Sequence, residues 1–416
     1  MQKSFLKNVS LIVSGSAIAQ IIAFSISPIL TRIYTPSEFG QFSIILSAIN
    51  ILAIILTLRS EYILLLTSSL YKTKSSLHSS IAVVLVMTSI AILSFWGLSI
   101  TLPSNPYLNL SKFGFYIIIG AFTYSLWSIF LQFFTKIKHF TKHSTSNIVK
   151  QSAVSTLQIA SSNFFTNGLI SGKIIGDFIG TSYLGILVKR FISVKLLFKS
   201  CLPINLGSYL KDNLHITFTY STHSIINVLS NTLPLILFEL LFSTALTGQL
   251  GLTLRIMLGP VTIISYALSQ VINSDISSRR IQSKPIRPFI NKYLKTYGGT
   301  GLFLSAIIFF FIPDLFTFIF GSNWVTAGEY AQAIIPLVLL ISLTSPMSFI
   351  PQMHGKSRTA LIFESLNLIV RVISLYIGAI NNNPYLSILL FAITGSLLQA
   401  FLLSWYYKIC DFHLNE

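Results

Sequence analysis

Twelve apolar runs, each long enough to cross a lipid bilayer and separated from the next by a short polar gap, dominate this sequence. A transmembrane helix needs about 20 mostly apolar residues. Only 9% of the residues are charged, against about 25% in an ordinary soluble domain. So few charges could not cover the surface of a soluble chain of this length. The sequence predicts an all-α integral membrane protein, with spans at residues 9–31, 40–66, 79–102, 113–135, 147–167, 169–188, 214–238, 245–273, 298–320, 330–352, 360–380 and 385–407.

Basic residues gather in every second gap, and this pattern predicts the orientation. Lysine and arginine are retained on the cytoplasmic side of membrane proteins. We therefore expect both termini and the basic gaps in the cytoplasm. The net charge of +17 does not indicate a nucleic-acid partner, because such a site needs its basic residues on one soluble face. The cytoplasmic set is Lys72, Lys74, Lys136, Lys138, Lys142, Lys150, Lys189, Arg190, Lys195, Lys199, Lys211, Arg279, Arg280, Lys284, Arg287, Lys292, Lys295, Lys356 and Arg358.

A short repeat suggests that the chain consists of two similar halves. Residues 34–41 read YTPSEFGQ, and residues 242–249, which lie 208 positions later, read FSTALTGQ. Each copy follows a run with a proline near its end, Pro28 or Pro234. Halves of six spans share one orientation and are related by an axis along the membrane normal. We expect a six-helix lobe over residues 1–200, a second over residues 201–416, and a cavity between them.

Signatures of enzymes are missing from the sequence. It has no glycine-rich phosphate loop, no H-E-x-x-H motif and no long extramembrane segment to hold an active site. His139 and His143 lie four apart in a basic gap without a third ligand, and we interpret them as a solvated pair. Cys201 and Cys410 fall at the expected cytoplasmic face, where a disulfide is not favoured. We predict no catalytic residues, no metal and no cofactor.

Charged residues within the predicted spans are the candidate site, because each costs a few kcal/mol at the bilayer centre unless it faces a cavity or a partner. Arg255 lies about nine residues inside its span, and either a cavity role or a buried ion pair would explain it. Arg371, near the middle of its span, has the same two explanations. The set is Arg59, Glu61, Lys173, Asp177, Arg255, Glu364 and Arg371.

Two pairs in this set raise separate questions. Arg59 and Glu61 are two apart, so on a continuous helix they would point to different faces. Lys173 and Asp177 are four apart and could neutralise each other, which would make them structural.

Two further patterns concern packing. Glycines at positions 168, 172, 176 and 180 form a small-residue stripe that lets another helix approach closely. Pro336, Pro346 and Pro351 interrupt the tenth span, as a static kink or as a point of bending.

Several segments resemble the oligosaccharide flippases (O-antigen, Wzx-type) of the multidrug/oligosaccharidyl-lipid/polysaccharide exporter (MOP) superfamily. The first is LTRIYTPSEFG at 30–40, similar to that family's L-T-R-x-Y-x-P-x-x-F-G. The others are TLRSE at 57–61, LSN at 229–231 with LP at 233–234, and WVTAGEYAQ at 324–332. The likeness extends over nearly the whole chain.

This resemblance implies a fold like that of the superfamily's MATE transporters and a place in the bacterial inner membrane. It implies that the protein flips an undecaprenyl-pyrophosphate-linked oligosaccharide from the cytoplasmic to the periplasmic leaflet for surface polysaccharide. Membrane lipid, a polysaccharide polymerase and a chain-length regulator would be its partners. A pyrophosphate needs a hydrated, cationic cavity, for which the candidates are Arg59, Arg255, Arg371, Lys173 and Arg32.

Asp177, Glu61 and Glu364 are candidates for coupling transport to protons or sodium. Three alternatives remain: a multidrug cation antiporter of the same superfamily, which would favour an acidic cavity; a membrane glycan polymerase or ligase; and a peptidoglycan-precursor flippase, which usually has two more helices. The excess of arginine over acids in the spans favours an anionic substrate.

Overall fold

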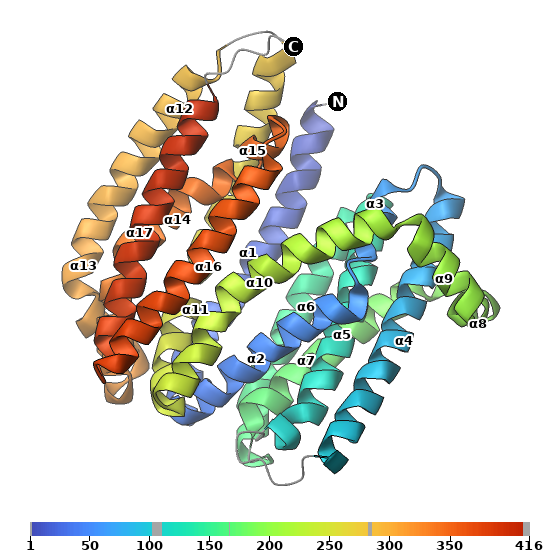
Figure 1. Cartoon of the computed structure of the whole chain (residues 1–416), viewed down its shortest axis with the longest axis horizontal. Coiled ribbons are helices and arrows are strands. Elements are labelled where there is room, and N and C mark those ends of the chain that lie inside the picture. The colour runs from blue at the N-terminus through green and yellow to red at the C-terminus, as the bar shows by residue number, and fades with distance from the viewer. Residues whose placement is uncertain (1, 102–109, 166, 282–284, 411–416) are drawn as a thin grey trace. The chain divides into compact units, whose positions relative to one another are not determined.

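The computed structural model describes residues 2–101, 110–165, 167–281 and 285–410, and every regular element within them is a helix (Figure 1). The long helices follow the predicted spans in order. They are α1 (Gln2–Ile33), α2 (Pro36–Thr57), α4 (Leu70–Thr101), α5 (Leu110–Lys136), α6 (Phe140–Ala160), α7 (Gly168–Val188), α10 (Leu214–Leu241), α11 (Thr244–Ile281), α13 (Gly299–Phe320), α14 (Val325–Thr344), α16 (Ser357–Ile380) and α17 (Pro384–Ile409).

Shorter helices join the long ones. They are α3 (Glu61–Leu66), α8 (Val194–Cys201), α9 (Pro203–Asp212), α12 (Arg287–Tyr293), α15 (Ile350–Met353), the 3-10 turns η1 (Ser161–Asn163), η2 (Lys189–Phe191), η4 (Ser322–Trp324) and η5 (Ser345–Met347), and the π-helical turn η3 (Leu294–Gly298).

The predicted all-α membrane fold is confirmed. Among the described residues, ten helical segments are long and apolar enough to cross a membrane. The fifth and sixth predicted spans correspond to α6 and α7, which are helical but fall outside those ten. In α6 the reason is a run of serine, threonine and glutamine, much of it buried against protein.

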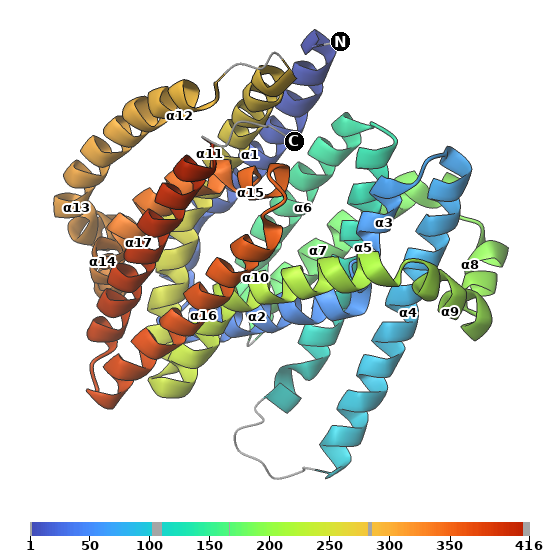
Figure 2. The same cartoon turned by 45° about the horizontal axis from the view of Figure 1, so that its top comes forward.

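Two compact units make up the chain. Unit 1 contains residues 1–26 and 44–229, and unit 2 contains residues 27–43 and 230–416. The lobe boundary at residue 200 stays a prediction, because it rests on a sequence repeat and these units rest on spatial contacts. Figures 1 and 2 show the helices of each unit from two directions.

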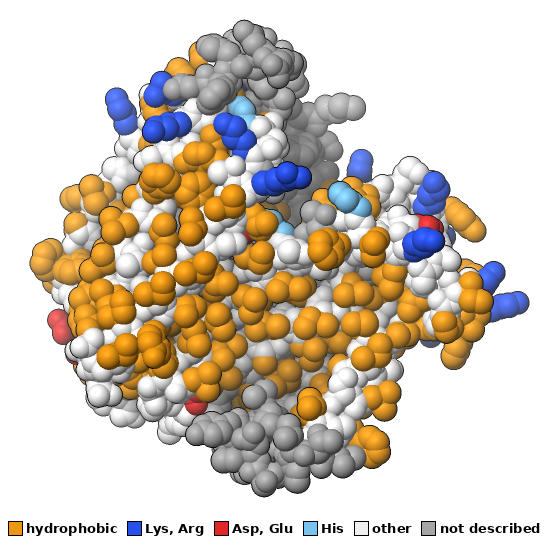
Figure 3. Space-filling model, in the orientation of Figure 1, with side chains coloured by type: hydrophobic (Ala, Val, Ile, Leu, Met, Phe, Trp, Pro, Cys, Tyr) orange, Lys and Arg blue, Asp and Glu red, His pale blue; other side chains and the backbone are white. Residues whose placement is uncertain are grey.

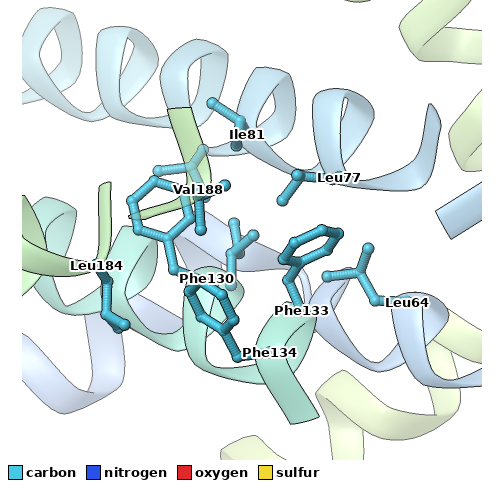
Figure 4. Packing of buried hydrophobic residues seen from close by; sticks show 10 residues of the cluster. Leu64, Leu77, Ile81, Phe130, Phe133, Phe134, Leu184 and Val188 are labelled. Carbon is cyan, nitrogen blue, oxygen red and sulfur yellow. The ribbon is translucent and has the colours of Figure 1, made fainter. Parts of the chain in front are cut away.

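In unit 1, α7 packs against α5 and α6, and α4 packs against α5 and α8. The core between these helices is made of aromatic and branched side chains (Figure 4), with Phe133 and Phe134 fully buried. The glycine stripe fulfils its predicted role on α7. A Cβ at Gly172 would lie 2.6 Å from the Gln158 nitrogen, and one at Gly176 would lie 2.5 Å from the Val154 Cα. The backbones of α6 and α7 are therefore in close contact.

In unit 2, α14 packs against α11, α13 and α17. The prolines of the tenth span have different effects: Pro336 lies inside the continuous α14, whereas the helix ends at Thr344, before Pro346 in η5 and Pro351 in α15. Lysine and arginine side chains gather at the end of the unit where α12 lies, and its flank is mostly apolar (Figure 3). This separation fits a helical bundle that crosses a bilayer.

The repeated segments meet each other in unit 2, at the first turns of α2 and α11. A Cβ at Gly40 would collide with the carbonyl oxygen of Thr244, and one at Gly248 with the carbonyl oxygen of Pro36. Pro36 and Thr244 are 208 residues apart, as are Gly40 and Gly248. The contact is therefore reciprocal, which supports the interpretation of the sequence repeat as a structural one.

Candidate functional site

A cavity of about 430 Å³ lies within unit 2, and we name it the Arg371 cavity. Its walls come from α10, α11, α14, α16, α17 and η5. Four residues of α11 present hydroxyl groups to it, at the spacing of one helix face: Thr262, Ser265, Tyr266 and Ser269. Among the described lining residues Arg371 is the one with a charged side chain. The cavity is thus apolar with a hydroxyl stripe and a cation.

The direct contacts of Arg371 are with neutral groups, and Glu364 on the same helix acts on it electrostatically. Its side chain is buried, with 6% of the residue exposed. The Nη1 atom donates a hydrogen bond of 2.6 Å to the backbone oxygen of Ser230, and the guanidinium lies 5.1 Å from the centre of the Phe391 ring. Its Nε, and the Oγ of Ser265, are buried with no hydrogen-bond partner among the described residues. Buried donors of this kind usually find a partner, and an anion entering the cavity would supply one.

Arg255 lies on α11, one turn after Gly251 on the face that packs against the start of α2. It is half-buried. The ion pairs found within the described residues do not include it, so the interpretation as a member of an ion pair is not supported. Leu254 and Leu258, its neighbours on α11, line the Arg371 cavity, whereas Arg255 itself does not.

The second predicted span is broken, and this corrects our expectation for Arg59 and Glu61. Helix α2 ends at Thr57, and α3 begins at Glu61. Leu58 and Arg59 have φ angles of +46° and +54°, a left-handed conformation that is unusual for such side chains. The turn brings Arg59 Nη1 to 3.1 Å from Glu61 Oε1, so the two side chains form an ion pair instead of facing apart.

This ion pair borders a smaller pocket within unit 1, of about 210 Å³, which we name the Arg59–Glu61 pocket. Its other polar lining residues are Asn50 and Thr57 on α2 and Tyr124, Ser125 and Ser128 on α5. Arg59 also lies over the ring of Tyr62, 5.6 Å from its centre. The sequence marked both charged residues but gave no sign of the turn that joins them.

Asp177 lies between two lysines in unit 1. Its carboxylate is 2.5 Å from Lys173 Nζ and 3.5 Å from Lys150 Nζ. The ion pair between Lys173 and Asp177 that their spacing allows is therefore present. Lys150, which we expected in a solvated gap, is instead buried on α6, with its Nζ 3.7 Å from the centre of the Trp127 ring. The polar face of α6 opposite the α7 glycines was the signal that could have located it.

The remaining candidates lie elsewhere in unit 2. Arg32 is exposed in the last turn of α1. Glu364 is half-buried on α16, seven residues before Arg371. Neither residue lines the Arg371 cavity.

Two of the segments that carry the resemblance, 30–40 and 324–332, lie at a structural junction. Trp324 Nε1 donates to the Thr31 carbonyl at 3.1 Å, and its ring packs edge-on against Phe39. Gln249 Nε2 donates to the Asn323 carbonyl at 2.6 Å, and Gln249 Oε1 accepts from the Ala327 nitrogen. These contacts hold helix ends together in unit 2.

Histidines and cysteines show no sign of metal binding. Within the described part of the chain, no three metal-ligating side chains cluster, and both cysteines are free thiols. The expectation of a solvated histidine pair is wrong for His143. His139 is exposed, but His143 in the first turn of α6 is half-buried, and burial lowers its pKa to about 4.

Three comparisons relate the chain to known proteins. No protein-family model matches the sequence, and no curated protein sequence matches it. Solved structures do match. A lipid II flippase, MurJ, in an inward closed conformation has a TM-score of 0.72 at 14% identity, over 95% of this chain and 89% of MurJ.

Two transporters of the MOP superfamily also match. An outward-facing multidrug resistance transporter of the MATE family has a TM-score of 0.63 at 11% identity, over 97% of this chain and 96% of that one. A transporter from Pyrococcus furiosus has a TM-score of 0.60 at 12% identity, with the same coverage. These proteins are transporters and a flippase, not enzymes. The chain is a multi-pass membrane protein with the fold that the MOP superfamily transporters share.

Proposed function

We propose that this protein flips an undecaprenyl-pyrophosphate-linked oligosaccharide from the cytoplasmic to the periplasmic leaflet of the bacterial inner membrane. The observation that carries the proposal is Arg371, a buried cation on the wall of a cavity, held by a backbone carbonyl and an aromatic ring. Burying a guanidinium costs several kcal/mol. A site that retains one beside unsatisfied donors suits an anionic ligand, and the guanidinium fork matches phosphate oxygens.

The acids in unit 1 argue against a cavity for cationic drugs. Asp177 contacts two lysines, and Glu61 pairs with Arg59. Neither carboxylate offers an uncompensated negative charge, which a cationic drug would need. The similar structure MurJ is named a lipid II flippase. Its shared fold is therefore compatible with flipping of a lipid-linked substrate.

In this proposal the two lobes, 1–200 and 201–416, alternate access to the two leaflets, with the basic gaps and both termini in the cytoplasm. An inside-negative potential favours outward movement of an anion by about 2.3 kcal/mol per charge per 100 mV. Asp177, Glu61 or Glu364 would couple protons or sodium. A polysaccharide polymerase and a chain-length regulator would take the product. If flipping proved indifferent to voltage and to ion gradients, this form of energy coupling would be excluded.

The test is flipping of a fluorescent polyprenyl-pyrophosphate-linked N-acetylglucosamine in proteoliposomes that contain the purified full chain. We expect flipping by the wild type and at least tenfold slower flipping by Arg371→Ala, because a charged hydrogen bond to phosphate is lost. Arg358→Ala is the matched control, since Arg358 is exposed at the start of the same helix. Efflux of ethidium without any flipping of the lipid would replace the proposal with the drug antiporter.

A further inference from the structure

We propose that the Arg59–Glu61 pocket of unit 1 is a binding site for an uncharged sugar ring, distinct from the Arg371 cavity of unit 2. The inference rests on the proposed function for the identity of the sugar, which would be part of the transported glycan. It assigns the two pockets to different chemistry: a polyol in one and a phosphate in the other.

The backbone at the wall of this pocket has an unusual conformation. Two consecutive residues without glycine's freedom, Leu58 and Arg59, adopt positive φ angles of +46° and +54°. Such a conformation is strained and persists where surrounding structure enforces it, often at ligand sites. This turn breaks the second span and places the Arg59 and Glu61 side chains at one pocket wall.

Two buried hydrogen-bonding atoms at this wall have no partner among the described residues. Glu61 is buried, with 1% of its surface exposed. Its Oε1 accepts from Arg59 Nη1, but its Oε2 has no hydrogen-bond partner among the described residues. The Nε of Arg59 is likewise buried and without one. A buried carboxylate oxygen without a donor is rare in a folded protein, so the pocket offers one strong acceptor and one donor to a ligand.

The charges on the pocket lining decide which kind of ligand the pocket suits. The two charges that line the pocket, on Arg59 and Glu61, cancel. Asn50, Tyr124 and Ser128 add groups that both donate and accept. A neutral, mixed set of this kind favours hydroxyl groups over an anion or a cation, because neither charge finds an uncompensated partner. Sugar hydroxyls donate and accept at once, as these side chains do.

A nearby positive charge makes the anion the alternative to be tested. Lys150 Nζ lies 5.1 Å from the centre of the Tyr124 ring, and Lys150, Lys173 and Asp177 together carry one net positive charge. However, Lys150 contacts Asp177 and the Trp127 ring and is not a lining residue of the pocket. Of the two orphaned atoms on the lining, Glu61 Oε2 repels phosphate, and the guanidinium that carries the other, Arg59 Nε, is already neutralised by Glu61. We therefore favour the sugar.

The experiment measures binding of two probes to the full chain in nanodiscs. The first probe is the neutral oligosaccharide that mild acid and phosphatase release from the host's own lipid-linked intermediate, followed by saturation-transfer NMR. The second is inorganic pyrophosphate, followed by phosphorus NMR. We expect Glu61→Gln to weaken binding of the oligosaccharide about tenfold and to leave pyrophosphate binding unchanged. Arg371→Ala should have the opposite pattern.

The controls separate this inference from folding and from the proposed function. Asn50→Ala should also weaken sugar binding, and it keeps the test valid if Glu61→Gln does not fold. Glu329→Gln removes an exposed acid of α14 and should change neither probe. The inference is overturned if the wild type does not bind the oligosaccharide, or if pyrophosphate binding depends on Glu61 or Asn50. Sugar binding that depends on Glu61, without flipping of any lipid, would support the inference and refute the proposed function alone.

Discussion

The two units treat their buried charges in opposite ways. In unit 1 each buried acid contacts a cation: Glu61 pairs with Arg59, and Asp177 lies between Lys150 and Lys173. In unit 2 the buried Arg371 contacts a carbonyl and an aromatic ring instead. A paired charge costs less to retain in a low-dielectric interior than an unpaired one. The difference supports the proposal that Arg371 of unit 2 binds an anionic ligand, whereas the buried acids of unit 1 are paired with cations.

The largest effect should follow from reversing the charge of a cation of unit 2 that lies outside the ion pairs. Arg255 is in none of the ion pairs found among the described residues. Arg255→Glu would replace this cation with an acid. We expect surface polysaccharide to fall about a hundredfold while the protein remains folded in the membrane, because the variant replaces an attraction for an anionic substrate with a repulsion. Quantitative blotting of polysaccharide and of the protein measures both. Wild-type polysaccharide in this variant would remove Arg255 from the candidates for substrate contact.

Removing the shared acid of unit 1 should have the next largest effect. Asp177→Asn leaves Lys150 and Lys173 beside each other without compensation, and breaking a buried ion pair costs about 3 kcal/mol. We expect a lower free energy of unfolding in denaturant titrations of the detergent-solubilised protein. Lys150→Met added to this variant should restore part of the stability. An unchanged stability would show that the carboxylate is not structural.

A smaller effect should follow from removing one of the two lysines. Lys173→Met leaves Lys150 and Asp177 as a neutral pair, and the Lys173 side chain is 20% exposed. We expect a loss of about 1 kcal/mol in the same titrations. A loss as large as that of Asp177→Asn would mean that Lys150 does not compensate the acid alone.

The smallest effect concerns pH and unit 1. The pKa of His143 is about 4 in the folded protein and about 6.5 in an unfolded chain. Because the unfolded state binds the proton more readily, stability is full above pH 6.5 and falls as the pH drops towards 4. We expect a loss on the order of 1 kcal/mol at pH 5 relative to pH 7, measured by thermal unfolding. His143→Leu should reduce this dependence, and an equal dependence in that variant would contradict the assignment.

The sequence predicted the helices well because hydrophobic length is a local property. It did not predict the break at Leu58 and Arg59, since no glycine or proline marks a left-handed turn there. It also misplaced Lys150, because a lysine in a polar segment resembles a loop residue until a second helix, here α7, packs over it. Arg371 could be identified from its depth in a span, but its hydrogen-bond partner Ser230 lies 141 residues away in the sequence. Local sequence patterns do not predict contacts between residues so far apart in the chain.

The reciprocal crossing of α2 and α11 has a consequence for ancestry. Equivalent residues exchange places there, Gly40 against Thr244 and Gly248 against Pro36. This is the form of an isologous contact, the kind that joins identical subunits in a two-fold dimer. Two separate copies of a half-length chain could make the same contact without any new surface. The crossing thus preserves, inside one polypeptide, the geometry by which two identical polypeptides would have recognised each other.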